Sequence, residues 1–403
     1  MKYEFDEIIN RQNTNAMCVD GYKEYLFGDI DEIKLPCAEQ ELVSMWIADM
    51  GFAVAPEIIA AIKQRLDKQI LGYTQLAGSQ YQHAFLDWAQ SHYGVVFNEQ
   101  HLVNSQGIVP ALFDLVKYLC KADDKVIIFT PSYGFFKHAV DNHQIELVSC
   151  DLIKEQNSYV MGLVRFEELA KDSKTKVCLF CNPHNPTGRV WTENELKEFA
   201  RICFANNITI VSDEIHCDLL RKGQSFTPLA KLYPTNDNII TCMAPSKTFN
   251  LAGMMFASLI IPNDKLRKQW QEDHLPVVNP LSLVAAHAAY SKAGKWLQAL
   301  RDYLDKNFLF LHDYLKKYLP KAVYTIPEST YLAWIDLSSY LGKEQNITLF
   351  FVEKAGVLLE GGNMFVANAQ GHIRLNVACP KSILEDALNK ITIAIQKEAA
   401  SKP

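Results

Sequence analysis

The sequence predicts an α/β fold, with a large and mostly parallel sheet and a second, smaller α+β domain. From about residue 43 to about residue 280, helical and strand-like segments alternate, which is the pattern of a parallel sheet covered by helices. The strand-like segments are short apolar runs without polar alternation, as expected for strands buried on both faces. After about residue 279 the chain changes to long amphipathic helices followed by a β-rich part.

The elements of the predicted large sheet can be placed in order. The N-terminal stretch to about residue 42 is polar and irregular, and the clearest helix is predicted over residues 108–121. Pro110 falls in the first turn of that helix, where a missing N–H costs little. Its apolar residues recur at helical spacing on one face; they are Ile108, Leu112, Leu115, Val116 and Leu119. The strand candidates are residues 125–130, 145–150, 177–180, 208–212 and 238–242.

The C-terminal part is predicted to add strands at residues 331–335 and 372–376 and then a last helix. Ser382 and Glu385 have the spacing of a capping box for this helix. Its inward face would carry Leu384, Leu388, Ile391 and Ile395.

We therefore predict a large domain over residues 43–285 and a small domain built from residues 1–42 and 286–403. In an open sheet of parallel strands, ligands bind at the carboxyl ends of the strands. Candidate functional residues are accordingly those that follow each strand.

The composition narrows the class of protein. The chain has 403 residues, of which 49% are hydrophobic and 21% charged, as in soluble globular proteins. A formal net charge of -6 argues against nucleic acid as a partner. The start of the chain is charged, so we expect no secretory signal. The longest apolar run, residues 251–261, is too short for a membrane span, which needs about 20 residues.

Ten cysteines without a visible signal peptide predict reduced thiols and a cytoplasmic protein. Cys178 and Cys181 form one C-x-x-C pair inside a strand-like run, where alternation sends the two side chains to opposite faces. We therefore expect neither a zinc site nor a redox site there.

Lys247 and Asp213 are the first candidates for chemistry, because each closely follows a predicted strand. Taken singly, the lysine reads as a surface cation and the aspartate as a helix cap. Taken together, they suit pyridoxal phosphate. The lysine amine would form a Schiff base with the cofactor and then act as general base at the substrate α-carbon. The carboxylate would keep the pyridine nitrogen protonated, so that the ring remains an electron sink.

Two further residues follow strands. Asn185 lies in the segment N-P-H-N-P-T-G of residues 182–188, which makes a rigid turn in any case and whose asparagine could donate to the phenolic oxygen of the cofactor. Tyr133 follows the strand at 125–130 and is either a packing residue or an aromatic that stacks on the pyridine ring.

Two candidate binding sites for charged groups complete the set of candidate functional residues. Ile108 and Val109 open the clear helix, and the free N–H groups of a helix N-terminus bind phosphate, although every helix offers such groups. Arg374 lies in the predicted strand 372–376. Its planar guanidinium can bind both oxygens of a substrate carboxylate. The alternative role is a surface ion pair.

The motifs that carry these residues resemble those of a known group. They are N-P-H-N-P-T-G (182–188), S-D-E-I-H (212–216), S-K-T-F-N-L-A-G (246–253), I-R-L-N-V-A-C-P (373–380), M-W-I-A-D-M (45–50), G-Y-T (72–74), G-I-V-P-A-L (107–112) and T-Y-L-A-W-I-D (330–336). In this order, and across nearly the whole chain, they resemble the fold-type I pyridoxal-phosphate enzymes, specifically the MalY/PatB cystathionine β-lyases. The resemblance implies a mostly parallel seven-stranded sheet in the large domain.

The resemblance also implies a role for each matching residue. Lys247 would be the catalytic Schiff-base lysine and Arg374 the carboxylate clamp, with Asn185 and Tyr133 contacting both substrate and cofactor. The other cofactor-binding residues would be Asp213, His216, Ser246, Ile108 and Val109. Tyr73 would reach the cofactor phosphate of a neighbouring subunit, which implies a homodimer.

Some positions distinguish branches of this group. His216 stands where aspartate-type aminotransferases carry a tyrosine, and Met255 where they usually carry a phosphate-binding arginine. Both differences favour a lyase. Gly51, Ser329 and the segment 365–369 depart from the lyase pattern. We expect these positions to border the substrate mouth and to affect the choice of substrate.

The leading hypothesis is therefore β-elimination on an amino acid with sulfur at Cβ, which yields pyruvate, ammonia and a thiol. An aminotransferase is the first alternative, because the same residues serve it and the two differ in how Lys247 steers the proton. A second alternative is a regulatory partner protein that keeps the fold and binds a transcription factor. The complete set of catalytic residues argues against regulation as the sole role.

Overall fold

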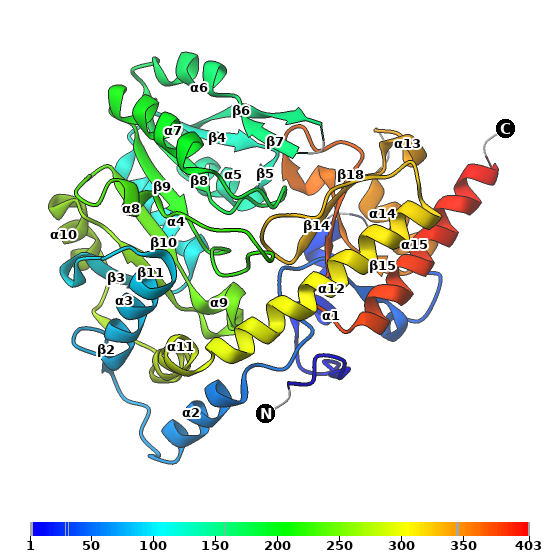
Figure 1. Ribbon diagram of the computed structural model, residues 1–403, viewed down its shortest axis with the longest axis horizontal. Coiled ribbons are helices and arrows are strands. Elements are labelled where there is room, and N and C mark those ends of the chain that lie inside the picture. The colour runs from blue at the N-terminus through cyan, green and yellow to red at the C-terminus, as the bar shows by residue number, and fades with distance from the viewer. Residues whose placement is uncertain (1–2, 29, 31, 157, 344–345, 402–403) are drawn as a thin grey trace.

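The centre of the computed structural model is a mixed sheet of eight strands in the order β3-β11-β10-β9-β8-β4-β6-β7 (Figure 1). The structure describes residues 3–28, 30, 32–156, 158–343 and 346–401. The strands are β3 (Leu102–Ser105), β4 (Lys125–Thr130), β6 (Glu146–Glu155), β7 (Ser158–Met161), β8 (Thr175–Cys181), β9 (Thr209–Asp213), β10 (Ile239–Met243) and β11 (Ala257–Ile260). Strands β6, β4, β8, β9 and β10 are parallel neighbours, whereas β11 and β7 pair antiparallel.

The predicted α/β class is confirmed, but the sheet has eight strands rather than seven. Strand β6 runs ten residues, and its second half extends past the end of β4. This leaves an open edge on which the chain folds back as β7, pairing Leu152 with Met161. The extra strand is therefore a local hairpin at the edge of the sheet.

Helices cover both faces of this sheet, because successive strand residues point to opposite sides. In β8, Val177, Leu179 and Cys181 pack with helices α4, α5 and α10, while Cys178 and Phe180 pack with α6, α7 and α8. The prediction that Cys178 and Cys181 face opposite ways is confirmed. Among the described residues, no group of histidine, cysteine, aspartate or glutamate side chains is suited to a metal ion.

Several helices begin at residues that favour helix N-termini. The capping box of Thr192 and Glu195 starts α7, and prolines occupy the first turns of α2 and α11. The helices are α1 (Met17–Asp20), α2 (Pro56–Leu66), α3 (Gln80–Tyr93), α4 (Ile108–Leu119), α5 (Gly134–Asp141), α6 (Leu163–Ala170), α7 (Glu193–Ala205), α8 (Leu229–Leu232), α9 (Pro245–Thr248), α10 (Asp264–Asp273), α11 (Pro280–Lys292), α12 (Gly294–Tyr318), α13 (Ser338–Leu341), α14 (Ile347–Ala355) and α15 (Lys381–Ser401). Within the described residues, no helix is long and apolar enough to cross a membrane.

The C-terminal residues form a second sheet, of four strands in the order β13-β14-β18-β16. These are β13 (Val323–Tyr324), β14 (Leu332–Asp336), β16 (Glu360–Gly361) and β18 (His372–Asn376), all paired antiparallel. Figure 1 shows the long helix α12 and the C-terminal helix α15 side by side near this sheet. The remaining strands are two-residue pairs: β1 (Val43–Ser44) with β15 (Val357–Leu358), β2 (Thr74–Gln75) with β12 (Val277–Val278), and β5 (Ser132–Tyr133) with β17 (Phe365–Val366).

The predicted start of the last helix is wrong. Helix α15 begins at Lys381, and the N–H of Leu384 donates to the carbonyl of Pro380 at 3.2 Å. Ser382 and Glu385 therefore lie inside the helix, where they cannot form its capping box. The predicted inward residues are buried; they are Leu384, Leu388, Ile391 and Ile395.

The core under α6 and α7 generates a stability prediction. Phe199 is fully buried and stacks on Phe180 with ring centroids 4.3 Å apart. Phe199→Ala should lower the free energy of unfolding by about 3–5 kcal/mol, because it removes buried area and leaves a cavity. Val164→Ala on α6 is the control, since Val164 is 80% exposed, and it should change the value by less than about 0.5 kcal/mol. Equal effects in chemical denaturation would contradict this assignment of the core.

Candidate active site

A cavity of about 310 Å³ lies at the carboxyl ends of β8, β9 and β10. Its walls come from the large sheet, from residues 47 and 48 near the N-terminus, and from the C-terminal strands β16 and β18. The predicted site residues that line it are Ile108, Val109, Tyr133, Asn185, Asp213, His216, Ser246, Lys247 and Arg374. Tyr73 lies elsewhere, with its side chain 94% exposed.

Lys247 lies in the short helix α9, which directly follows β10. Its Nζ donates to the carbonyl of Ala48 at 2.7 Å, and the next residue, Thr248, donates its hydroxyl to the buried Asp218 at 2.8 Å. Burial, and then the positive charge of Arg374, lowers the pKa of Lys247 to about 8. About a tenth of this amine is therefore unprotonated at pH 7, far more than for an ordinary lysine, and a nucleophile or a general base requires this neutral form.

Asp213 is the last residue of β9 and is buried opposite Cys242 in the neighbouring strand. Its Oδ1 accepts from the N–H of Ile215 at 3.2 Å. Burial raises the pKa of Asp213 to about 6, and the Ile215 N–H and Lys247 only partly oppose this shift. A buried carboxylate of this kind is stabilised by a cation, so the position suits a protonated ring nitrogen.

His216 and the start of α4 provide polar groups that point to a ligand. The Nδ1 atom of His216 is buried without a hydrogen-bond partner among the described residues. Burial, assisted by Lys247 and Arg374, lowers the pKa of His216 to about 3, so the ring is neutral. Gly107 precedes α4 with φ +133°, a backbone angle that favours glycine, and no side chain caps the helix. The N–H groups of Ile108 and Val109 are thus left for an anion.

Arg374, in β18, is the most buried cation of the cavity, at 1% exposure. Its Nη1 donates to Oδ1 of Asn185 at 3.0 Å, and one face of its guanidinium lies over the ring of Phe365 at 5.2 Å. Its Nη2 forms an ion pair with Glu360, directly opposite it in β16. Arginine and asparagine thus meet at one end of the cavity, where a carboxylate could bind.

Sequence reasoning missed Glu360, Tyr25 and the Ala48 carbonyl, all of which line the cavity. Glu360 carried a usable signal, since it ends the apolar run 357–359 in the same way that Asp213 ends its strand. Tyr25 lies in a π-helical turn over Lys23–Phe27, in a stretch that looked irregular, and its sequence offers no signal.

The positions that depart from the lyase pattern lie differently from expectation. Gly51 and Ser329 do not line the cavity that holds Lys247. Gly51 packs against Cys379, and Ser329 is buried, with its hydroxyl donating to the carbonyls of His216 and Leu219 at 3.0 and 3.1 Å. Phe365 lines an adjacent cavity. The first two therefore do not border the mouth of this cavity, and Ser329 contacts the backbone of His216 from behind.

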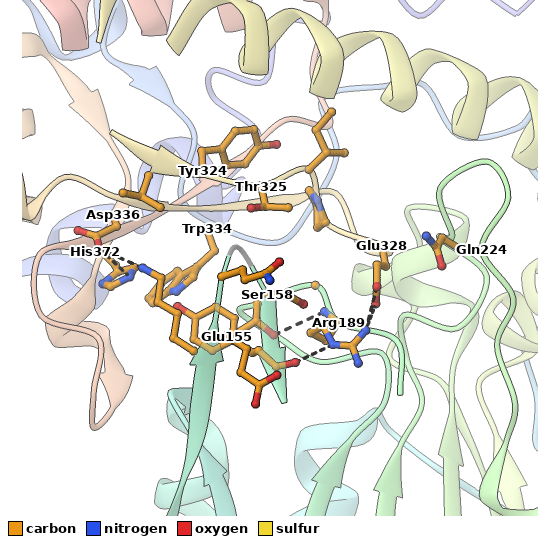
Figure 2. A pocket seen from close by; sticks show the side chains of 18 residues that line it. Glu155, Ser158, Arg189, Gln224, Tyr324, Thr325, Glu328, Trp334, Asp336 and His372 are labelled. Atoms are coloured by element: carbon orange, nitrogen blue, oxygen red, sulfur yellow. Dashed lines mark hydrogen bonds and ion pairs between the residues drawn. The ribbon is translucent and has the colours of Figure 1, made fainter. Parts of the chain in front are cut away.

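A separate cavity of about 380 Å³ lies between the β6–β7 hairpin and residues 323–328 (Figure 2). Its cations are already paired: Figure 2 shows Arg189 bound to Glu328, at 2.6 Å. Arg189 also binds Glu195 at 3.0 Å. Lys154 binds Asp336 at 3.3 Å. None of the predicted site residues lines this cavity, so the chemistry belongs to the cavity around Lys247.

The donor set of the main cavity fits pyridoxal phosphate. The unpartnered His216 Nδ1, the uncapped start of α4 and the buried Asp213 carboxylate would satisfy different parts of that molecule. Lys247 supplies the amine for covalent attachment. These groups come from separate elements and meet only in this cavity.

Comparisons with known proteins agree with the fit of this cavity to pyridoxal phosphate. The profile of the aminotransferase class I and II family matches residues 43–391. Cystathionine beta-lyase PatB of Bacillus subtilis is 33% identical over 396 residues, covering 97% of this chain and 99% of that protein. A PLP-bound C-S lyase from Staphylococcus hominis, solved with the inhibitor L-cycloserine, is 49% identical with a TM-score of 0.95, covering 98% of each chain. Cystalysin from Treponema denticola, solved with pyridoxal 5'-phosphate, is 31% identical with a TM-score of 0.92. The match covers 98% of this chain and 100% of that chain. The predicted resemblance is confirmed.

The lowered pKa of Lys247 leads to a prediction for the apoprotein. The rate of covalent uptake of pyridoxal phosphate should rise with pH and level off above about 8, because only the neutral amine attacks. The visible absorbance of the attached cofactor, followed by stopped flow, gives the rate. Lys247→Ala is the control and should show no such absorbance. A midpoint near 10.5, the ordinary lysine value, would mean that burial does not tune this amine.

Proposed function

Because the chain belongs to the aminotransferase class I and II family, we propose that it is a pyridoxal-phosphate-dependent carbon-sulfur β-lyase of the cystathionine β-lyase type. Its substrates are amino acids that carry sulfur at Cβ, and its products are pyruvate, ammonia and a thiol. The observation that carries this proposal is that a lysine of lowered pKa shares one cavity with a single arginine clamp. The named lyases among the similar proteins support the choice of reaction.

In this proposal Arg374 and Asn185 bind and orient the substrate carboxylate, which holds the α-carbon near Lys247. Lys247 then removes the α-proton, a step for which a pKa near neutrality is well matched. Bound pyridoxal phosphate supplies the electron sink that stabilises negative charge at the α-carbon. The carbon–sulfur bond breaks as the electron pair leaves with the thiolate.

The remaining residues hold the cofactor in place. Asp213 would keep the ring nitrogen protonated, Tyr133 would contact the ring, and Ile108 and Val109 would offer backbone N–H groups to the phosphate. His216 and Ser246 line the same wall of the cavity as Lys247 and complete the polar contacts. The presence of these residues in one cavity supports the proposed roles.

One feature favours the lyase over an aminotransferase for dicarboxylic acids. Among the described residues that line the cavity, Arg374 is the only arginine and Lys247 the only lysine. A second carboxylate next to the reacting carbon would therefore have no cation to bind. Met255 also lines this cavity, at 55% exposure, and adds no charge to it.

The central test uses the purified holoenzyme with cystathionine and no keto acid. Pyruvate should form continuously, and Lys247→Ala should abolish its formation, since the general base is lost. Stoichiometric conversion of the cofactor to its pyridoxamine form, reversed by a keto acid and without a thiol product, would establish the aminotransferase instead. A Lys247→Ala protein that keeps its full effect in the cell would point to a regulatory role.

We also infer that the protein works as a homodimer in the cytoplasm, with Tyr73 reaching the partner's cofactor. Several apolar side chains in the segments that flank Tyr73 and the strand β12 are exposed, which supports an interface there; they are Leu66, Ile70, Leu71 and Leu275. The β2–β12 ladder brings the segments that carry them together. All ten cysteines are free, which is consistent with a reducing compartment.

A mixed dimer tests the shared site. Co-expressed Tyr73→Ala and Lys247→Ala subunits should form heterodimers with one intact site, containing Lys247 from one chain and Tyr73 from the other. Their lyase activity should recover to about half of the wild-type value per dimer, while each parental variant alone remains impaired. The control is a mixture prepared from the separately purified variants before subunit exchange. Activity no higher than that of the control would contradict a site shared between subunits.

A further inference from the structure

The ion pair between Glu360 and Arg374 is imposed by the small sheet. Glu360 in β16 lies directly opposite Arg374 in β18, and directly opposite residues of an antiparallel pair have neighbouring side chains. Both side chains are buried, at 4% and 1% exposure. A carboxylate of the protein therefore occupies one side of the guanidinium that the proposed function assigns to the substrate carboxylate.

Glu360 cannot move away with its backbone. A Cβ on Gly362 would lie 1.7 Å from the carbonyl oxygen of Ala369, so the chain passes in direct contact there. The N–H of Gly361 donates to the hydroxyl of Thr348 at 2.8 Å. The backbone that carries Glu360 is thus held beside Arg374.

A second cavity, of about 810 Å³, adjoins the one around Lys247. Four residues line both cavities and form the boundary between them: Tyr25, Tyr133, Phe135 and Glu360. The rest of its wall is mixed: the side chains of Met17, Phe113, Met364 and Phe365 are apolar, whereas those of Glu24, His138, Asp141 and Asn142 are polar. No lysine or arginine lines it within the described residues, and its other charged or titratable groups are Glu24, Asp141 and His138.

The charges around Arg374 do not balance once a substrate is bound. One guanidinium then faces two carboxylates, that of the substrate and that of Glu360, in a buried place where an unpaired charge is costly. Lys247 cannot supply the missing positive charge throughout the reaction, because it must be neutral to accept the α-proton. Burial raises the pKa of Glu360, which reflects the same need for a cation or a proton.

We propose, on the basis of the proposed function, that Glu360 is a specificity-determining residue that selects thioether amino acids whose sulfur substituent carries an ammonium group. The substituent extends from the cavity around Lys247 toward the second cavity along Glu360, which lines both, and its ammonium pairs with the Glu360 carboxylate. An anionic substituent is excluded, because it would meet the carboxylates of Glu360 and Glu24 and no lysine or arginine among the described lining residues; the carboxylate of Asp141 is already paired with Lys137. The apolar walls receive the carbon chain.

Three S-substituted L-cysteines of matched length test this proposal. They are the S-(3-aminopropyl), S-butyl and S-(2-carboxyethyl) derivatives, whose chains end in an ammonium, a methyl and a carboxylate. With wild-type holoenzyme, kcat/KM for pyruvate release should be at least about tenfold higher for the ammonium than for the butyl compound, and lowest for the carboxylate. Equal values for the ammonium and butyl compounds, or a preference for the carboxylate, would overturn the proposal without any variant.

Glu360→Gln keeps the shape and removes the charge. It should bring the ammonium and butyl compounds within about threefold of each other, with the value for the butyl compound nearly unchanged. Glu24→Gln is the matched control, because Glu24 lines the same cavity but is exposed to solvent, and it should retain the wild-type order. The visible absorbance of the cofactor verifies that each variant is loaded.

Other outcomes would overturn the proposal. An equal loss of kcat/KM for all three compounds in the Glu360→Gln enzyme would show that Glu360 only positions Arg374. Cleavage of cystathionine without discrimination among the three compounds would overturn the role of Glu360 and leave the lyase function standing. No pyruvate from cystathionine or from any of the three would overturn both. If the Glu360→Gln protein does not bind the cofactor, the order of the three kcat/KM values measured with the wild-type enzyme decides whether the proposal holds.

Discussion

The hydrogen bond between Arg374 and Asn185 joins two parts of the chain that lie 189 residues apart. Asn185 belongs to the loop after β8 of the large sheet, whereas Arg374 belongs to the second sheet. Because the two meet at 3.0 Å, the clamp for a substrate carboxylate is held over the same cavity as Lys247. The proposed lyase chemistry, and the charge problem at Glu360, both depend on this contact.

Burial shifts the pKa values of the titratable groups in this cavity in directions that suit their proposed roles. The same loss of water that lowers the pKa of Lys247 raises that of Asp213 and keeps His216 neutral. The sheet produces this effect by placing each residue just beyond a buried strand end. No single neighbouring charge dominates, since burial is the largest cause for all three groups.

Much of the fold and of the site could be predicted, because the signals are local. Short apolar runs located β4, β8, β9 and β10 to within a few residues. Lys247 and Asp213 stood out because each follows such a run. The edge strand β7 was missed because its formation depends on how far β6 extends past β4. The start of α15 was misplaced because Ser382 satisfies a capping pattern that the chain does not use.

The sequence by itself determined the α/β class, the positions along the chain of the strands that carry chemistry, and the residue types suited to pyridoxal phosphate. These follow from hydrophobic periodicity and from short motifs, both of which act within a few residues. Only the tertiary structure decided that Glu360 lies against Arg374, that Tyr25 joins two cavities, and that Ser329 supports His216 from behind. These contacts arise from strand register and from packing between distant segments, and no spacing along the chain encodes them.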